Sequence, residues 1–295
     1  MKSGFVALAG RPNAGKSTLI NALVKEKIAI VSAKPQTTRS EIRGIVNTDD
    51  AQIVFTDTPG IHKARHRLEQ RMNKEAANVI QGVDVIYMVV DGSVPFGSGD
   101  QYVLQMVENA GLPVFLIFNK IDRLKREKVL KNLQSWQERF DFAEIFPISA
   151  LKQNDFSDLL ETTKKYLPDG EPFFPKDIVS DNPENFRIAE IIREKILETT
   201  EEEVPHSTAV VIEAKECDHN SCTIQALILV EKSGQKGIII GKNGARLKRI
   251  GTLARTDIEK LLGVHVYLTL FVRVEEEWRD RDSRITEYGY GYTDE

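Results

Sequence analysis

Short apolar runs recur along the first half of the chain, and most end in a polar residue. The uninterrupted runs are residues 5–9, 85–90 and 114–118, and a shorter one follows at 145–148. Such runs are typical of strands buried on both faces of a parallel sheet. Residues 41–47 alternate instead, and a turn signal joins them to the strand predicted at 51–56. We therefore expect an α/β domain with a mostly parallel six-stranded sheet, one antiparallel hairpin, and helices on both faces.

The second half has a different pattern. Residues 186–199 carry apolar positions at helical spacing, 208–214 and 223–230 read as strands, and 264–274 alternates strictly after a helix that ends near residue 262. The order helix, strand, strand, helix, helix, strand predicts a separate α+β domain. We place the boundaries at 1–170 for the first domain, 171–185 for a linker, 186–280 for the second domain and 281–295 for a tail. The proline-rich linker is either a flexible tether or is pinned to one domain by its phenylalanines.

Composition narrows the possibilities. A chain of 295 residues is long enough for two domains, and its net charge of −4 means that any nucleic-acid site must rest on a local basic patch. The chain has two cysteines and no apolar run of about 20 residues. The first strand begins almost at Met1, which leaves no room for a signal peptide. We expect a cytoplasmic protein.

A glycine-rich loop joins the first predicted strand to the first predicted helix. It reads Gly-Arg-Pro-Asn-Ala-Gly-Lys-Ser, the G-x-x-x-x-G-K-S pattern of a phosphate-binding loop. Loop N–H groups and the helix N-terminus face the anion in such a loop. Lys16 is expected to reach the β- and γ-phosphates, and the Ser17 hydroxyl to bind Mg²⁺. The nucleotide-binding residues expected here are Gly10, Arg11, Pro12, Asn13, Ala14, Gly15, Lys16 and Ser17.

The polar loop at 32–40 follows the first helix. It contains Pro35 and the sequence Gln36-Thr37-Thr38-Arg39. A threonine hydroxyl in such a loop binds Mg²⁺ when a γ-phosphate is present and releases it after hydrolysis. We favour Thr38 over Thr37 for this role.

The strand at 51–56 ends in Asp57-Thr58-Pro59-Gly60, followed by Ile61. Asp57 is placed to hold Mg²⁺ through water, and Gly60 lets its N–H approach the γ-phosphate. We therefore assign metal binding to Ser17, Thr38 and Asp57. The expected catalytic residues are Lys16, Thr38 and Gly60, and residues 57–61 (Asp57, Thr58, Pro59, Gly60, Ile61) are all expected to lie at the nucleotide.

Two later segments predict recognition of the base. The run at 114–118 leads into Asn119-Lys120-Ile121-Asp122, and the run at 145–148 leads into Ser149-Ala150-Leu151. The Asp122 carboxylate can accept two hydrogen bonds from guanine N1 and N2, which adenine does not offer. Asn119 can bond the base edge and brace the loops, the Lys120 stem can lie along the ring, and the Ala150 N–H is expected to meet guanine O6.

Together these segments, in this order and spacing, resemble the translation-factor-related GTPases. The forms Gly-Arg-Pro-Asn-x-Gly-Lys-Ser and Gln-Thr-Thr-Arg are similar to the Era, Der and TrmE branch over residues 4–167. The resemblance implies GTP and GDP as ligands, Mg²⁺ as cofactor, and GTP hydrolysis. Where many small GTPases carry a water-orienting glutamine this chain has Ile61, so intrinsic hydrolysis should be slow. In related enzymes the loop asparagine that corresponds to Asn13 helps to hold K⁺. The alternative is that Asn13 only stabilises the turn.

A second glycine loop, G-x-x-G at 241–244, lies in the later domain. Between 232 and 255 there are seven basic residues and no acidic one, the footprint of an anionic partner. The isoleucines at 238–240, this loop and the final alternating strand resemble a type II KH module, whose loop clamps about four nucleotides. The residues expected to contact RNA are Lys236, Ile238, Ile239, Ile240, Gly241, Lys242, Asn243, Gly244, Arg246, Lys248 and Arg249.

Two smaller features admit alternatives. Cys217, His219 and Cys222 lie close together and could bind a metal. A zinc ion needs four ligands and this segment offers only three, so we favour a surface turn with reduced thiols over a metal site. Trp278 and the tyrosines at 288, 290 and 292 can stack on bases, but we expect them to pack against the terminus.

A GTPase domain followed by a type II KH domain resembles the Era family across nearly the whole chain. The resemblance implies binding of the 3′ end of 16S ribosomal RNA as a single strand, a role in maturation of the small (30S) ribosomal subunit, and peripheral association with the inner face of the cell membrane. We expect a monomer. The alternative is a tRNA-modification or other Era/Der-like GTPase whose KH-type domain serves protein contact.

Overall fold

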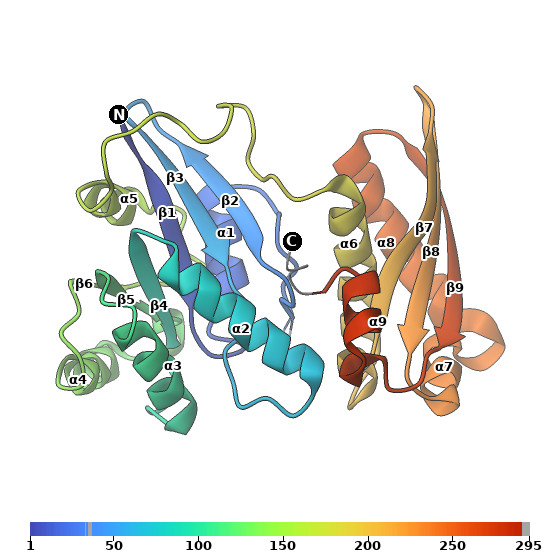
Figure 1. Cartoon of the computed structure of the whole chain (residues 1–295), viewed down its shortest axis with the longest axis horizontal. Helices are drawn as coiled ribbons and strands as arrows, with labels where there is room; N and C mark the ends of the chain where they lie inside the picture. Colours follow the sequence, from blue (N-terminus) through green and yellow to red (C-terminus); the bar gives the residue numbers. More distant parts are fainter. Residues whose placement is uncertain (33, 35–36, 291–295) are drawn as a thin grey trace. The chain divides into compact units, whose positions relative to one another are not determined.

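Two compact units make up the chain in the computed structural model, which describes residues 1–32, 34 and 37–290 (Figure 1). The first unit contains residues 1–65 and 69–181, and the second contains 66–68 and the residues from 182 onward. Most of the predicted linker therefore groups with the first unit. Pro35, Gln36 and Tyr292 lie outside the described residues.

A six-stranded sheet in the order β2-β3-β1-β4-β5-β6 forms the centre of the first unit (Figure 1). The strands are β1 (Lys2–Ala9), β2 (Ile42–Asn47), β3 (Ala51–Asp57), β4 (Val85–Asp91), β5 (Val114–Asn119) and β6 (Glu144–Pro147). All neighbours pair in parallel except β2 and β3, which are antiparallel. The predicted sheet with one hairpin is confirmed. Because β1, β3, β4, β5 and β6 run in parallel, the loops at their carboxyl ends meet at one edge, where α/β folds bind ligands.

Helices cover both faces of this sheet. They are α1 (Lys16–Val24), α2 (Arg67–Gln81), α3 (Ser98–Glu108), α4 (Arg126–Gln137) and α5 (Ser157–Lys164). Residues of α2, α3 and α4 pack in one cluster with Ile86 and Met88 of β4. On the other face, the Tyr87 hydroxyl is hydrogen-bonded to the Thr163 hydroxyl of α5. Alternate residues of one buried strand thus serve two separate layers of helix.

The linker is pinned to the first unit by one side chain. Gln52 on β3 is fully buried, and its Oε1 accepts hydrogen bonds from Phe173 N at 2.7 Å and Phe174 N at 2.9 Å. Its Nε2 donates to the Phe174 carbonyl at 2.8 Å. The Phe173 ring lies 4.6 Å from that of Phe5. These contacts favour the pinned linker over the flexible tether.

The second unit contains a three-stranded sheet in the order β7-β8-β9. Its elements are α6 (Glu184–Thr199), β7 (Ala209–Cys217), β8 (Ser221–Val230), α7 (Ser233–Ile240), α8 (Ala245–Leu262) and β9 (His265–Val274). Isoleucines of α6, α7 and α8 pack with Cys222, Ile224 and Ala226 of β8 in one core. The predicted element order is confirmed. Short 3₁₀ turns complete the chain: η1 (Ile121–Arg123), η2 (Val204–His206), η3 (Lys242–Gly244) and η4 (Trp278–Asp280), followed by α9 (Asp282–Glu287).

The two smaller sequence features have clear outcomes. Cys217 and Cys222 face each other across the β7–β8 hairpin and form a disulfide, so the prediction of reduced thiols is wrong because the strand register makes them direct neighbours. Trp278 and Tyr290 are buried, with ring centroids 5.8 Å apart, so the predicted packing of the terminus is confirmed.

Within the described residues, no group of His, Cys, Asp and Glu forms a metal cluster. No described helix combines the length and apolar character that crossing a membrane requires.

Candidate functional site: a nucleotide pocket and a basic groove

A cavity of about 450 Å³ lies at the carboxyl edge of the first sheet. The glycine loop forms its floor, and Lys16, the first residue of α1, is buried there. The Lys16 ammonium donates to the carbonyls of Gly10 at 3.1 Å and Arg11 at 3.2 Å. Burial lowers the pKa of Lys16, and the charge of Asp57 opposes that fall. A buried cation held at a helix N-terminus suits an anionic ligand.

The three residues predicted to bind magnesium lie together. The Ser17 hydroxyl donates to Asp57 Oδ2 at 2.6 Å and lies 2.8 Å from the Thr38 hydroxyl, which is 3.1 Å from the same carboxylate oxygen. Asp57 Oδ1 is buried and has no hydrogen-bond partner in the described part of the chain. Burial raises the pKa of Asp57, against the charge of Lys16. Two hydroxyls and an unsatisfied carboxylate oxygen are the hard oxygen donors that Mg²⁺ prefers, so these residues fit that ion.

Thr37 and Thr38 are clearly distinguished. The Thr37 hydroxyl donates to the Lys34 carbonyl at 2.7 Å, within its own loop, whereas Thr38 faces Asp57. The geometry therefore agrees with the preference for Thr38.

The segment after Asp57 approaches the glycine loop closely. A side chain at Gly60 would meet Pro12 at 2.8 Å, so only glycine fits there. The Ile61 N–H donates to the Gly10 carbonyl at 3.1 Å, and the Ile61 side chain is fully buried in the apolar core. Ile61 is therefore turned away from the cavity as well as unable to hydrogen-bond water.

Asn119 braces the loops around the base pocket. Its Nδ2 donates to the Ala14 carbonyl at 2.9 Å, and its Oδ1 accepts from Ala150 N at 2.9 Å. The amide thus serves the bracing role that we expected, and the Ala150 N–H expected to face guanine O6 already has an acceptor. Gly15 is required beneath it, because a Cβ there would lie 2.2 Å from Asn119 Nδ2.

Asp122 keeps one carboxylate oxygen for a ligand. Its Oδ1 accepts from the Ser149 hydroxyl at 2.6 Å, and this bond lowers the pKa of Asp122. Its Oδ2 lies 4.0 Å from Lys152 Nζ. Lys120 lies across the same pocket, with its ammonium 2.6 Å from Asp91 Oδ2. Although burial alone would raise it, the pKa of Asp91 is lowered by this Lys120 bond.

The cavity contains most of the predicted nucleotide residues. Those that line it are Pro12, Asn13, Gly15, Lys16, Ser17, Thr38, Gly60, Asn119, Lys120, Asp122, Ala150 and Leu151. Arg11 does not, because its guanidinium pairs with Asp100 on α3 at 2.9 Å. Other residues of the motifs are not part of this lining: Gly10, Ala14, Asp57, Thr58, Pro59, Ile61, Ile121 and Ser149. Thr37, the alternative to Thr38, also lines the cavity. Six further lining residues were not predicted from the motifs: Thr18, Ile30, Val31, Ser32, Asp91 and Arg123. Of these six residues, only Asp91 could have been predicted from the sequence, because it is the polar residue that ends a buried strand.

A second hollow lies in the other unit, between α8 and β9, with a volume of about 620 Å³. Lys248 and Arg255 line it from α8, and residues 265–270 line it from β9. The glycine loop stands at one end through Gly244. Lys242, Lys248 and Arg249 are exposed. An open groove with basic side chains along one wall is suited to a flexible anionic chain.

The two glycines of this second loop both have a left-handed backbone conformation. Gly241 and Gly244 have φ of 71° and 77°, in the region that glycine adopts most easily, and Asn243 between them has φ of 52°. No described atom lies within 4 Å of where a Cβ would stand on Gly244. At Gly241, by contrast, a Cβ would stand 2.8 Å from the Cβ of Arg246, so this position is crowded by the start of α8 as well as left-handed.

Two residues predicted to contact RNA are used by the fold itself. Ile239 is fully buried in the core of the second unit, because α7 turns its apolar face toward the sheet. The Arg246 guanidinium donates to the Ile238 carbonyl at 2.6 Å and ties α8 to the end of α7. For Ile239 this placement corrects the expectation of an exposed base-contacting side chain.

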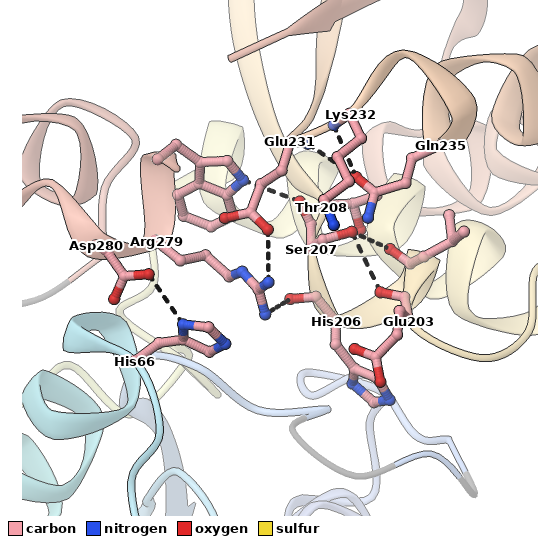
Figure 2. Close-up of polar contacts among 12 residues, drawn as sticks. His66, Glu203, His206, Ser207, Thr208, Glu231, Lys232, Gln235, Arg279 and Asp280 are labelled. Carbon is pink, nitrogen blue, oxygen red and sulfur yellow. Dashed lines mark hydrogen bonds and ion pairs between the residues drawn. The ribbon is translucent and has the colours of Figure 1, made fainter. Parts of the chain in front are cut away.

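The start of α7 is anchored by the C-terminal segment, as Figure 2 shows. Gln235 Oε1 accepts from Glu231 N and Lys232 N at 2.9 and 3.0 Å, which closes the first turn of the helix. Arg279 pairs with Glu231 at 2.5 Å and donates to the His206 carbonyl at 3.4 Å. Both side chains of the Arg279–Glu231 pair are nearly buried. This pair fixes the helix that leads into the glycine loop, and nothing in the sequence pattern signalled it.

Comparison with known proteins finds a known family for each of the two units. The family described as 50S ribosome-binding GTPase matches residues 5–120, and the KH domain family matches residues 203–279. The GTPase Era of Clostridium kluyveri is 49% identical over 98% of this chain and 99% of its own length. Two crystal structures each share 40% identity over 99% of this chain and all of theirs, with a TM-score of 0.95. One is a variant of Aquifex aeolicus Era bound to GDP and AlF₄⁻, and the other is Era with MgGDPNP and nucleotides 1506–1542 of 16S ribosomal RNA. With a relative at 49% identity over nearly its full length, this chain belongs to the GTPase Era family.

Proposed function

We propose that this protein hydrolyses GTP as a switch and, in its GTP state, binds the 3′ end of 16S ribosomal RNA in the groove between α8 and β9 during maturation of the small subunit. The observation that carries the proposal is the cluster of Ser17, Thr38 and Asp57 beside the buried Lys16. Thr38 belongs to a loop and Asp57 to a strand, so a bound ion held by all three would order the loop.

The chemistry at the phosphates follows from this cluster. Ser17, Thr38 and Asp57 would hold Mg²⁺, which supplies positive charge against the β- and γ-phosphate oxygens. Lys16 would neutralise the same oxygens from the floor of the pocket, and the Gly60 N–H would meet the end of the phosphate chain. Because Ile61 is buried in the core, this chain has no side chain at that position to orient water. We therefore expect slow intrinsic hydrolysis.

Base selection rests on Asp122. Its Oδ2 remains available beside the pocket while Ser149 holds Oδ1, so it can accept from guanine N1 and N2. Adenine has no donor pair at these positions, and a site built around such bonds rejects it by a large factor. Equal affinity of the purified protein for GTP and ATP, measured by calorimetry, would contradict this part of the proposal.

For RNA binding, the support is the acid-free basic run at residues 232–255, which spans α7, the glycine loop and the first part of α8, and the likeness to a structure that contains the RNA. The test uses the full chain with a non-hydrolysable GTP analogue or GDP, and an RNA of nucleotides 1506–1542. We expect at least a fivefold higher RNA affinity in the GTP-analogue state. Equal affinity in both states would remove the coupling.

A charge reversal tests the groove itself. Lys242→Glu with Lys248→Glu changes two exposed groove-side cations without touching Arg246, which holds the loop. We expect a loss of RNA affinity of roughly 100-fold and a weaker salt dependence. The matched control is Lys128→Glu with Lys131→Glu, two exposed lysines on α4 that undergo the same change of charge. Equal effects of both pairs would favour the alternative, in which the KH unit contacts protein.

Three finer statements are carried by family resemblance. We infer that K⁺ assists hydrolysis near Asn13, whose φ of 64° also suits the turn-stabilising alternative. Replacing K⁺ by Na⁺ at constant ionic strength should lower the hydrolysis rate if the potassium role is correct. We also infer a monomer in the cytoplasm that associates peripherally with the membrane, which light scattering and flotation with anionic vesicles would test.

A further inference from the structure

The face of the second sheet that points away from its helices carries two exposed aromatic rings. Every second residue of β8 packs into the helix-facing core, so Thr223, Gln225 and Leu227 point to the opposite, outer face. Their partners on β9 are Tyr267, Thr269 and Phe271. Tyr267 is 58% exposed and Phe271 is 48% exposed. A single exposed aromatic ring is common, but two such rings on one open sheet face form a patch of the kind that marks an interaction site.

The far end of the outer face is already covered. Arg273, the next outer-face residue of β9, lies close enough to Tyr288 of the C-terminal segment to oppose the rise in its pKa that burial causes. Leu229, the β8 partner of Arg273, is fully buried. The C-terminal segment thus occupies this end and leaves the stretch from Tyr267 to Phe271 open. Four residues of strand separate the two rings by roughly 13 Å.

The open stretch is continuous with the groove. β9 is the edge strand of the sheet, and its residues 265–270 form one wall of the groove between α8 and β9. Tyr267 belongs to that wall and to the outer face at once. The His265 ring meets the Tyr267 ring edge to face at 4.9 Å. A chain that leaves the groove over this edge meets Tyr267 first and Phe271 next.

The surroundings of the rings favour bases over a protein partner. Thr223, Gln225 and Thr269 lie between and beside the rings and offer hydrogen-bonding groups, whereas a protein interface core would surround them with apolar side chains. The acidic Glu216 lies on β7, the strand farthest from the groove, so the path for an anionic chain is confined to β8 and β9.

From these observations, and resting on the RNA binding proposed above, we propose that the outer face of the sheet is a second RNA-binding site. Single-stranded RNA that fills the groove crosses the β9 edge, and its next bases stack on Tyr267 and Phe271. Exposed aromatics on an open sheet bind single strands in this way with little sequence preference. The groove and the outer face then act as one continuous track for a single strand longer than the glycine loop can hold.

Phe271 is the decisive position because it does not line the groove. Phe271→Leu keeps apolar cover over Leu227 and removes the aromatic face. RNA affinity is measured by fluorescence anisotropy on the full chain with a GTP analogue, using the RNA of nucleotides 1506–1542 and fragments trimmed from either end to roughly six nucleotides. We expect Phe271→Leu to weaken binding of the long RNA roughly tenfold and to leave the shortest groove-bound fragment within about twofold. Tyr102→Ala, an equally exposed aromatic on α3, should change neither.

Phe271→Trp supplies a positive control. A larger aromatic face should retain the affinity for long RNA, and its fluorescence should be quenched by the long RNA but not by the shortest fragment. An identical affinity ratio of Phe271→Leu to wild type at every RNA length would overturn the second site. A failure of the underlying proposal, RNA binding in the groove, would look different. In that case Lys242→Glu with Lys248→Glu would leave the binding of all RNAs unchanged.

Discussion

Each unit carries a glycine loop immediately before a helix, yet the glycine next to the helix has different surroundings in the two loops. In the loop before α1, Gly15 has a φ of 102°, and a Cβ there would strike Asn119 at 2.2 Å. In the loop before α8, Gly244 has a φ of 77° and open space around it. The glycine before α1 is wedged against a neighbouring loop, whereas the glycine before α8 is restrained mainly by its own dihedral angles. The crowding in the second loop lies at Gly241 and comes from Arg246, five residues further along the same segment.

The difference matches the ligands that we propose for the two sites. A nucleotide is one small molecule of fixed shape, and a pre-formed pocket braced by Asn119 selects it by hydrogen bonds. An RNA strand is long and flexible, and an open loop and groove bind it by charge and stacking. Selectivity should therefore be sharp in the first site and graded in the second, and four predictions examine this comparison.

The largest effect is expected for Asp122→Asn. An amide at this position can no longer accept two hydrogen bonds from guanine, so GTP affinity should fall roughly 1000-fold, which is about 4 kcal/mol. Xanthosine triphosphate, which has a carbonyl where guanine has its amino group, should bind better to the variant than GTP does. Calorimetric titration with both nucleotides measures this, and unchanged GTP affinity would mean that base selection lies elsewhere.

Gly15→Ala compares steric crowding with backbone strain. The variant adds a clash with Asn119 to the cost of a left-handed residue, and we expect a loss of about 3 kcal/mol in stability together with loss of GDP binding. Gly111→Ala is the matched control, because Gly111 has a φ of 62° and no described atom near its Cβ position. The control should lose only about 1 kcal/mol in urea unfolding. Equal losses would remove the distinction between the two kinds of glycine.

The stability of the first unit should depend on pH because of Glu75 on α2. Burial raises the pKa of Glu75 from 4.5 to about 7, and its Oε1 accepts from Glu41 N at 2.6 Å. Because the folded state binds the proton more tightly, stability is complete below the unfolded pKa and falls as the pH rises through about 7. The difference of 2.5 units corresponds to at most about 3 kcal/mol.

Glu75→Gln removes this titration. The variant should be more stable than wild type by up to about 3 kcal/mol near pH 9 and nearly equal to it near pH 4.5, as measured by urea unfolding across that range. Glu108→Gln, an exposed residue on α3, serves as the control and should leave the wild-type pH profile intact. A parallel pH profile for Glu75→Gln and wild type would show that another group causes the slope.

The smallest effect is expected at Gly244. Gly244→Ala meets no neighbour, so stability should fall by only about 1 kcal/mol, and Gly244→Asn should lose less because asparagine tolerates the left-handed region. RNA affinity should fall by no more than roughly threefold in either variant. A collapse of RNA binding in Gly244→Asn would indicate that phosphates contact the glycine itself, and the second loop would then resemble the first.

Sequence reasoning was strongest where a motif fixes both residue type and spacing. Ser17 and Asp57 are far apart in the chain, yet the motifs predicted that they lie together, and the Ser17 hydroxyl donates to Asp57 Oδ2 at 2.6 Å. It was weakest where a side chain turns toward its own fold. Ile239 was expected at the RNA, but helical phase directs it into the core. Arg246 was also expected there, and no sequence pattern indicated that its guanidinium donates to a carbonyl of the preceding helix.

Other features depend on contacts that no local pattern encodes. The Arg279–Glu231 pair joins positions 48 residues apart, and Gln52 reaches the linker across 121 residues. The Cys217–Cys222 disulfide needed the hairpin register, which a two-residue shift would have destroyed. Such contacts are products of tertiary structure and become visible only once strands and helices are placed.

The pinning of the linker by Gln52 decides where this chain can be divided. A fragment ending at residue 170, where the sequence suggests the GTPase domain stops, would strip Phe173 from Phe5 and leave Oε1 of the buried Gln52 without its two backbone donors. Extending the fragment to residue 181 keeps every one of these bonds. The proline-rich stretch is thus a structural part of the GTPase unit, and isolated preparations that omit it would suffer from an exposed apolar edge and poor solubility.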